Sequence, residues 1–291
     1  MNSRWEKKVM NRRKLEEKFF KILMLGSMWL VLGSLVLILA TVVWRGLPAL
    51  NLAMLTQIPK GGYYLGKEGG ILNAIVGSLY LAGGGTALAL LASLPIAFYL
   101  QIYAARSRRV ELARLALDVL WGVPSIVYGA FGFTLMLWLG MRASLLAGII
   151  TLALLELPIM ARAMDEAIAM VPRALKEASY ALGATRLETA LKVVVRQTAP
   201  GLLTAILLAF GRGIGDAASV LFTAGYTDRL PDSLLSPAAS LPLAIFFQLG
   251  TPFPAVQDRA YASALVLTVL VLALSLVSRR LAGRLTKHII R

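Results

Sequence analysis

A short polar stretch separates two strongly apolar parts of the chain and reads Glu177-Ala178-Ser179-Tyr180-Ala181-Leu182-Gly183-Ala184. It is too polar to cross a bilayer, and it carries the signals of a capped helix. Pro172 suits the first turn of a helix because it has no N–H to leave unpaired. Gly183 supplies the left-handed residue that commonly ends one. The sequence therefore predicts a short helix, a glycine turn and a further helix, which we call the elbow (residues 172–188).

The elbow combines an apolar stripe with the start of a second helix. Apolar residues recur at three- and four-residue spacing at Ala174, Leu175, Ala178 and Leu182. Thr185 and Glu188 form a Thr-x-x-Glu capping box, which starts the next helix. One interpretation is an amphipathic connector on the membrane surface. The alanines, with Ser179 beside them, favour a knob that fits a groove on a protein, because lipid insertion favours Trp, Phe and Leu.

The composition is that of an integral membrane protein. The chain has 291 residues, of which 58% are hydrophobic, and a mean hydropathy of +0.73. Apolar runs of about 20 residues are long enough to span the hydrocarbon core as helices. We expect an all-α protein with six transmembrane helices, at residues 20–44, 71–103, 113–140, 143–161, 201–225 and 260–279.

The strong positive charge follows the membrane topology. The net charge of +15 suggests nucleic acid at first, but no basic stripe with interleaved aromatic residues supports such binding. Of the 30 Lys and Arg residues, 23 lie on the N-terminal side of the membrane, in the segments there or within two residues of a span end, and six lie on the opposite side. This asymmetry predicts a multi-pass protein of a prokaryotic cytoplasmic membrane with both termini in the cytoplasm.

The expected organisation has five parts. Residues 1–19 form a basic cytoplasmic terminus and residues 20–44 a first transmembrane helix, too long for the apolar region of a signal peptide. An external loop at 45–70 precedes a transmembrane domain at 71–280, whose cytoplasmic loop spans about 162–200. Residues 281–291 form a basic cytoplasmic tail.

The residue types present exclude several kinds of site. The chain has no cysteine and one histidine, His288, in the basic tail. Disulfides, Cys-ligated metals and histidine-based triads are therefore excluded, and we expect no metal site or catalytic residues. Gly61 to Lys67 reads Gly-x-x-x-x-Gly-Lys, but Glu68 stands where a P-loop needs Ser or Thr. We interpret it as a glycine-rich turn.

Two charged residues fall inside the fifth predicted span. Arg212 and Asp216 each cost about 2.5–3.5 kcal/mol at the centre of a bilayer, so a reason for their presence is needed. Their four-residue spacing would place both on one helix face. They form either a structural ion pair or an anion contact, in which Arg212 holds the anion and Asp216 positions Arg212 and tempers its affinity. Gly211 and Gly215 suggest close helix packing. Glu156 in the fourth span is assigned no role.

The elbow resembles the EAA loop of the permease subunits of ABC importers. Glu177, Ala178 and Gly183 match the pattern at the expected spacing, and Ser179 replaces its second alanine. Arg196 falls where those permeases usually have proline. Three further segments resemble phosphate-importer permeases of the PstA type: Gly69 to Gly77, Val123 to Gly129, and Gly211 to Ala224, which contains Gly-Arg-Gly-Ile-Gly-Asp. The resemblance covers about residues 69–280.

This resemblance implies a type I ABC-importer permease fold and a role in phosphate uptake. It implies an ATP-binding cassette ATPase dimer that docks on the elbow through Glu177, Ala178, Ser179 and Gly183. ATP and Mg would belong to that partner, with no cofactor on this chain. A second permease subunit and an external phosphate-binding protein complete the implied machine. The alternatives are a permease for molybdate or an organic solute and a membrane enzyme that acts on phosphate head groups.

Overall fold

The computed structural model describes residues 3–60, 68–104 and 107–285, and almost all of them are helical. The stretch from Gly61 to Lys67 and the histidine at 288 lie outside these ranges. In chain order the elements are α1 (Ser3–Gly46), α2 (Leu52–Thr56), β1 (Pro59–Lys60), β2 (Glu68–Gly69), α3 (Leu72–Phe98), η1 (Tyr99–Tyr103), α4 (Arg108–Gly122), α5 (Ser125–Trp138), α6 (Leu145–Ala169), α7 (Arg173–Ala181), α8 (Arg186–Glu188), η2 (Thr189–Val194), α9 (Val195–Gly215), α10 (Leu241–Leu249) and α11 (Pro254–Leu285).

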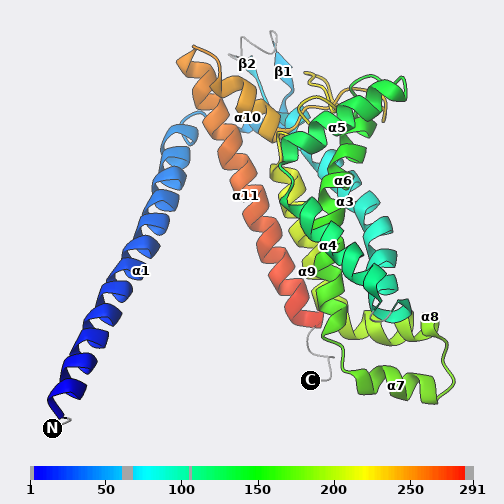
Figure 1. Ribbon diagram of the computed structural model, residues 1–291. Helices are drawn as coiled ribbons and strands as arrows, with labels where there is room; N and C mark the ends of the chain where they lie inside the picture. Colours follow the sequence, from blue (N-terminus) through cyan, green and yellow to red (C-terminus); the bar gives the residue numbers. More distant parts are fainter. Residues whose placement is uncertain (1–2, 61–67, 105–106, 286–291) are drawn as a thin grey trace.

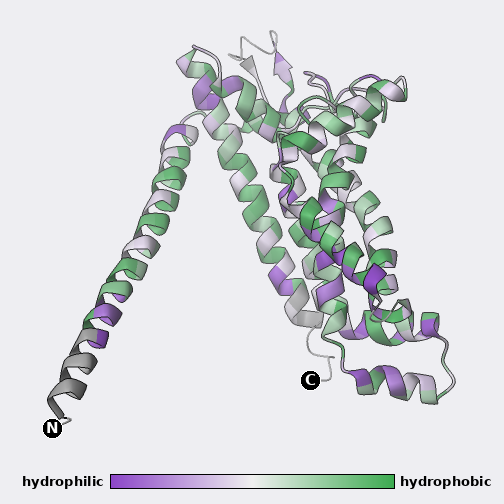
Figure 2. Cartoon of the chain, in the orientation of Figure 1, coloured by the Kyte–Doolittle hydropathy of each residue, from purple (hydrophilic) through white to green (hydrophobic). Residues whose placement is uncertain are grey.

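The described part of the chain has five helices long and apolar enough to cross a membrane, or six if α4 and α5 together make one span. Hydrophobic residues run along α1, α3 and α11, whereas α7 carries hydrophilic ones (Figure 2). The expected all-α membrane architecture is therefore confirmed. The two-residue strands β1 and β2 pair antiparallel, with Pro59 opposite Gly69.

The third predicted span, 113–140, is wrong as a straight helix. α4 and α5 meet at an angle of 100°, with Val123 extended and Pro124 after it. Proline removes a backbone donor and disfavours a helical conformation in the residue before it. The Tyr128 hydroxyl donates a hydrogen bond of 2.9 Å to the carbonyl of Leu120. This side chain therefore satisfies one acceptor that the broken helix leaves free.

Two other predicted spans end elsewhere. α6 continues to Ala169, eight residues past the predicted end at 161, because the charges in its last turns are paired. α9 ends at Gly215, well before the predicted 225, and residues 218–224 form turns. The apolar pattern continues through those residues because Val220 and Ala224 are buried in the protein. Hydropathy alone cannot distinguish a buried turn from a lipid-facing helix.

α3, α6 and α9 form the packed centre of the molecule. Their buried residues share one core that includes Ala89, Met160, Met164, Leu202 and Ala209. Glycines in α3 let α6 approach closely: a Cβ on Gly85 would lie 3.0 Å from the Cβ of Leu152, and one on Gly84 would lie 2.6 Å from Ile149 Cδ1. The helix is unbroken there, so these glycines serve packing.

α1 leans away from this centre and meets it at one end (Figure 1). Arg45 of α1 forms an ion pair of 3.1 Å with Asp258 of α11 and stacks over the Tyr261 ring at 4.5 Å. The start of α1, the end of α11, α7 and α8 all lie at one end of the molecule, which we call the elbow end (Figure 1). β1, β2 and α10 lie at the opposite end.

Candidate translocation groove and coupling elbow

A groove of about 720 Å³ lies between α9 and α11. We call it the α9–α11 groove. It is lined by Thr204, Leu207, Leu208, Phe210, Gly211, Arg212, Gly215, Asp216, Val271, Leu274, Ser275, Ser278 and Arg279. Both charged residues predicted within the fifth span therefore border one cavity.

Arg212 lines this groove without a polar partner among the described residues. It lies on the same face of α9 as Leu208 and Thr204, at four-residue intervals. Its side chain is exposed, and within the described ranges it forms no hydrogen bond or ion pair. A guanidinium with five free donors in a fixed fork is suited to an oxyanion. The structure thus gives no support to an Arg212–Asp216 ion pair.

Asp216 lies just past the end of α9, so the expected shared helix face is wrong. Its backbone is extended, with φ −85° and ψ 123°. Its carboxylate accepts a hydrogen bond of 2.8 Å from the backbone N–H of Ser219. This contact holds Asp216 at the groove by capping the turn that follows.

Close helix packing on α9 occurs at a different glycine from the predicted pair. A Cβ on Gly211 or Gly215 would meet nothing within 4 Å, so close helix packing is wrong for this pair within the described chain. Gly213, between them, is the closely packed one. A Cβ there would lie 2.5 Å from Leu152 Cδ2 and would also strike Glu156.

Glu156 is buried behind the wall of the groove, where α3, α6 and α9 meet. It is 0% exposed. One carboxyl oxygen accepts a hydrogen bond of 2.7 Å from the Thr86 hydroxyl. The other has no hydrogen-bond partner among the described residues and faces Gly213. The sequence alone assigns Glu156 no role, because its partners come from helices that are distant in sequence.

The segments after α4 and α9 contact each other directly. A Cβ on Gly129 of α5 would lie 2.6 Å from the Ala218 carbonyl oxygen and 3.0 Å from that of Ser219. Only a glycine permits this approach of α5 to the turn that Asp216 caps. The position of Asp216 thus depends on the break between α4 and α5.

The elbow has the predicted local structure. α7 ends before Gly183, which has φ +82°. Thr185 and Glu188 form the predicted capping box, with hydrogen bonds of 3.2 Å and 3.0 Å. α8, η2 and α9 then follow one another without a gap. The second elbow helix is therefore the first part of the fifth spanning helix, so the elbow is joined directly to the helix that lines the groove.

The predicted apolar stripe divides between two faces of α7. Leu175 packs against the core, and Ser179 is buried, 2.9 Å from the Thr189 hydroxyl. Ala174 and Ala178 are exposed, and Leu182 is 89% exposed. The outer face of the elbow is therefore Ala174, Glu177, Ala178 and Leu182. Ser179 contacts the chain's own η2 and is not part of that face.

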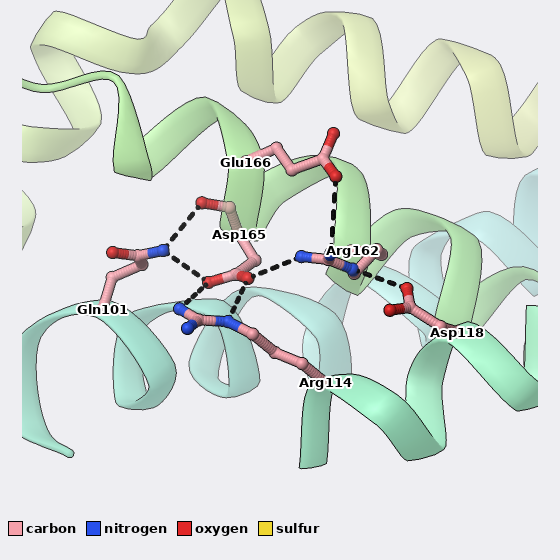
Figure 3. Close-up of polar contacts among 6 residues, drawn as sticks. All are labelled: Gln101, Arg114, Asp118, Arg162, Asp165 and Glu166. Carbon is pink, nitrogen blue, oxygen red and sulfur yellow. Dashed lines mark hydrogen bonds and ion pairs between the residues drawn. The ribbon is translucent and has the colours of Figure 1, made fainter. Parts of the chain in front are cut away.

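A network of charged side chains ties α6 to η1 and α4 beside the elbow (Figure 3). Asp165, whose side chain is 2% exposed, accepts hydrogen bonds of 2.8 Å and 3.1 Å from Arg114 and 3.1 Å from Arg162. Gln101 donates a hydrogen bond of 2.7 Å to the same carboxylate. Arg162 also pairs with Asp118 at 2.6 Å. These contacts fix the inner end of α6, from which the elbow continues.

A cavity of about 760 Å³ lies between this network and α7. Arg173 and Lys176 of α7 line it together with Arg114 and Arg162. Burial lowers the pKa of Lys176, and the charge of Arg173 lowers it further. The inner side of the elbow is thus basic, whereas its outer face carries one acid, Glu177, among apolar residues.

Removing the central carboxylate should destabilise the protein. Replacing Asp165 by asparagine leaves the partly buried Arg114 without its acid and removes one of the acids of Arg162, and we expect a loss of about 2–3 kcal/mol of unfolding free energy. Glu166→Gln is the control, because Glu166 is 67% exposed and 3.7 Å from Arg162; it should change stability by less than about 0.5 kcal/mol. Thermal unfolding in detergent measures both changes. Equal effects of the two variants would show that Asp165 is not the central carboxylate of the network.

The C-terminal two thirds of the chain, which contain the groove and the elbow, match a known family. The family model described as "Binding-protein-dependent transport system inner membrane component" matches residues 93–291. This chain belongs to that family. It is therefore the membrane-spanning permease component of a bacterial transport system.

This permease is similar along nearly its whole length to curated relatives. It is 32% identical to a phosphate transport system permease protein PstA from Haemophilus influenzae over 273 residues, 94% of each chain. It is 34% identical to the protein of the same name from Yersinia pestis over 283 residues, 96% of this chain and 93% of that one.

Solved structures confirm the permease fold. An inward-facing structure of the MetNI methionine ABC transporter contains a chain with a TM-score of 0.61 and 18% identity, covering 74% of this chain and 95% of that one. A transporter that imports alginate gives a TM-score of 0.54 at 17% identity, with 88% and 96% covered. At these identities the likeness establishes the fold alone, which agrees with the expected type I importer fold.

Proposed function

We propose that this permease is one membrane subunit of an ATP-driven phosphate importer. The observation that carries the proposal is its similarity, over 94% of its length, to a relative named as a phosphate transport permease. The α9–α11 groove supplies a matching chemistry, because Arg212 lines it and has no hydrogen-bond or ion-pair partner among the described residues. The chain makes and breaks no covalent bond in this proposal.

Arg212 is the anion contact, and Asp216 limits its affinity. A phosphate oxygen pair fits the guanidinium fork, and the carboxylate at the same groove repels the bound anion. Asp216 acts from its capped turn, not through an ion pair. Such a site binds strongly enough to accept the anion and weakly enough to release it.

ATP hydrolysis and the second half of the translocation path are supplied by partner subunits. The outer face of the elbow docks on an ATP-binding cassette ATPase dimer that binds ATP and Mg, with Glu177, Ala178 and Gly183 carried over from the EAA resemblance. Ser179 supports the elbow from inside. A second permease subunit closes the translocation path, and an external phosphate-binding protein delivers the anion at the end that carries α10.

The proposed orientation places both termini and the elbow in the cytoplasm. The start of α1, the end of α11 and the elbow share one end of the molecule, and most Lys and Arg residues flank the spans there. Because the chain lacks cysteine, single cysteines can report their side without background. Leu182→Cys should react with an impermeant thiol reagent only in inverted vesicles, and Leu235→Cys only in intact cells. The reverse pattern would contradict the orientation.

Competition during uptake tests the cargo. Vesicles that contain this chain with its ATPase, second permease and binding protein should accumulate labelled phosphate, and unlabelled phosphate should compete while molybdate does not. ATP-dependent uptake of molybdate or an organic solute in place of phosphate would support an importer but contradict phosphate as its substrate.

A further inference from the structure

The elbow-side half of the α9–α11 groove contains its own donors for an anion. α9 leads away from the elbow end and α11 returns toward it (Figure 1). Thr204 is therefore the α9 lining residue nearest the elbow end, and Arg279 is the corresponding residue of α11. Arg212 and Asp216 line the other half. The two arginines mark different positions along one groove.

The donors of the inner half come from one face of α11. Ser275, Ser278 and Arg279 are three or four residues apart and all line the groove. None of the three has a hydrogen bond or ion pair within the described part of the chain. Thr204 donates its hydroxyl proton to the Pro200 carbonyl at 2.8 Å, so its oxygen can only accept. A guanidinium and two hydroxyls thus remain free to donate.

The two halves of the groove differ in charge. Arg212 shares its half with Asp216, whereas no acidic residue lines the half that holds Arg279. Arg212 and Thr204 are eight residues apart, about 12 Å along an α-helix. An oxyanion that leaves Arg212 toward the elbow end therefore approaches Arg279, a second positive charge with no acidic residue beside it in the groove.

We propose that Arg279, Ser275 and Ser278 form an inner oxyanion-binding position that receives the anion from Arg212 and releases it at the elbow end. The inference rests on the proposed function, which makes Arg212 the first contact. Arg279 draws the anion away from Arg212 and Asp216, and the groove releases it at the elbow end. Transport through the groove thus has two arginine contacts in series.

Charge-selective labelling tests the position without any transport step. In the assembled importer we compare how fast each cysteine variant reacts with an anionic and with a cationic thiol reagent. The ratio of these two rates should be about ten-fold higher for Ser275→Cys than for Leu235→Cys, which lies in an exposed loop outside the groove. Adding Arg279→Ala should abolish this preference, and inorganic phosphate should slow the labelling. A preference that survives Arg279→Ala, or labelling that no oxyanion slows, would overturn the inference.

Uptake kinetics give a second readout. Arg279→Ala should lower the maximal rate of phosphate uptake about ten-fold with little change in KM, since the binding protein captures phosphate first. Arg280→Ala is the matched control, because Arg280 is exposed and does not line the groove. Equal rates in the two variants would contradict an inner position. If molybdate, and not phosphate, is transported and protects Ser275→Cys, the inner position stands and the proposed cargo falls.

Discussion

Arg212→Ala is expected to reduce ATP-dependent phosphate uptake by about a hundred-fold while the protein still inserts and assembles. The guanidinium is the one positive charge in its half of the groove, and a forked, charge-assisted contact to an oxyanion accounts for a loss of that size. Folding should be unaffected because the side chain is exposed and forms no hydrogen bond or ion pair within the described chain. Uptake of labelled phosphate in vesicles measures the effect.

Two variants sharpen this test. Arg212→Lys keeps the charge but loses the fork, so its uptake should fall between those of wild type and Arg212→Ala. Arg229→Ala removes an arginine from the loop before α10, outside the groove, and should transport normally. Wild-type uptake by Arg212→Ala would remove Arg212 from the translocation path.

Ala178→Trp is expected to release the ATPase subunit. Ala178 is exposed on the outer face of the elbow, where a bulky tryptophan would occupy space that the docked partner needs. Blocking the centre of an interface costs about 2 kcal/mol or more, a loss of about thirty-fold in affinity. Copurification of the ATPase with tagged permease measures this loss, and phosphate-stimulated ATP hydrolysis should fall with it.

The matched control is the same substitution at the opposite end of the molecule. Ala255 is exposed in the first turn of α11, and Ala255→Trp should leave the ATPase bound.

Gly183→Pro, like Ala178→Trp, should release the ATPase, because proline cannot adopt the positive φ of the elbow turn. Full ATPase recovery with Ala178→Trp would show that the partner docks elsewhere.

The sequence predicts the elbow well because its signals are local. Gly183 and the Thr185–Glu188 capping box act within a few residues, and the structure contains both. Local spacing could not divide the elbow stripe correctly. Ser179 is buried because Thr189 of η2 lies beside it, and the path of η2 is a tertiary feature.

The ends of the spans could be predicted only in part. The residue before Pro124 carries a signal for a helix break, but bilayer length and hydropathy favour one continuous span. Past Gly215, apolar residues continue although the helix does not, since packing of the turn against Gly129 overrides the pattern. The predicted span therefore includes Asp216 in the helix, on one face with Arg212, whereas the structure places it after the helix end.

The ion network was missed because it is not local. Arg114 and Asp165 are 51 residues apart, and each alone resembles an ordinary charge at a helix end. Their pairing depends on how α4 packs on α6. Arg162 and Asp165, three residues apart on one predicted helix, were the one available signal.

The central claim is that this permease does not drive transport by itself. An ATP-hydrolysing partner that docks on the elbow changes its conformation. The most direct test measures phosphate accumulation in liposomes that contain the purified permease chain, with and without the ATPase and ATP. We expect accumulation only when the second permease, the binding protein, the ATPase and ATP are all present. Concentrative uptake by the isolated chain in the absence of nucleotide would contradict the account.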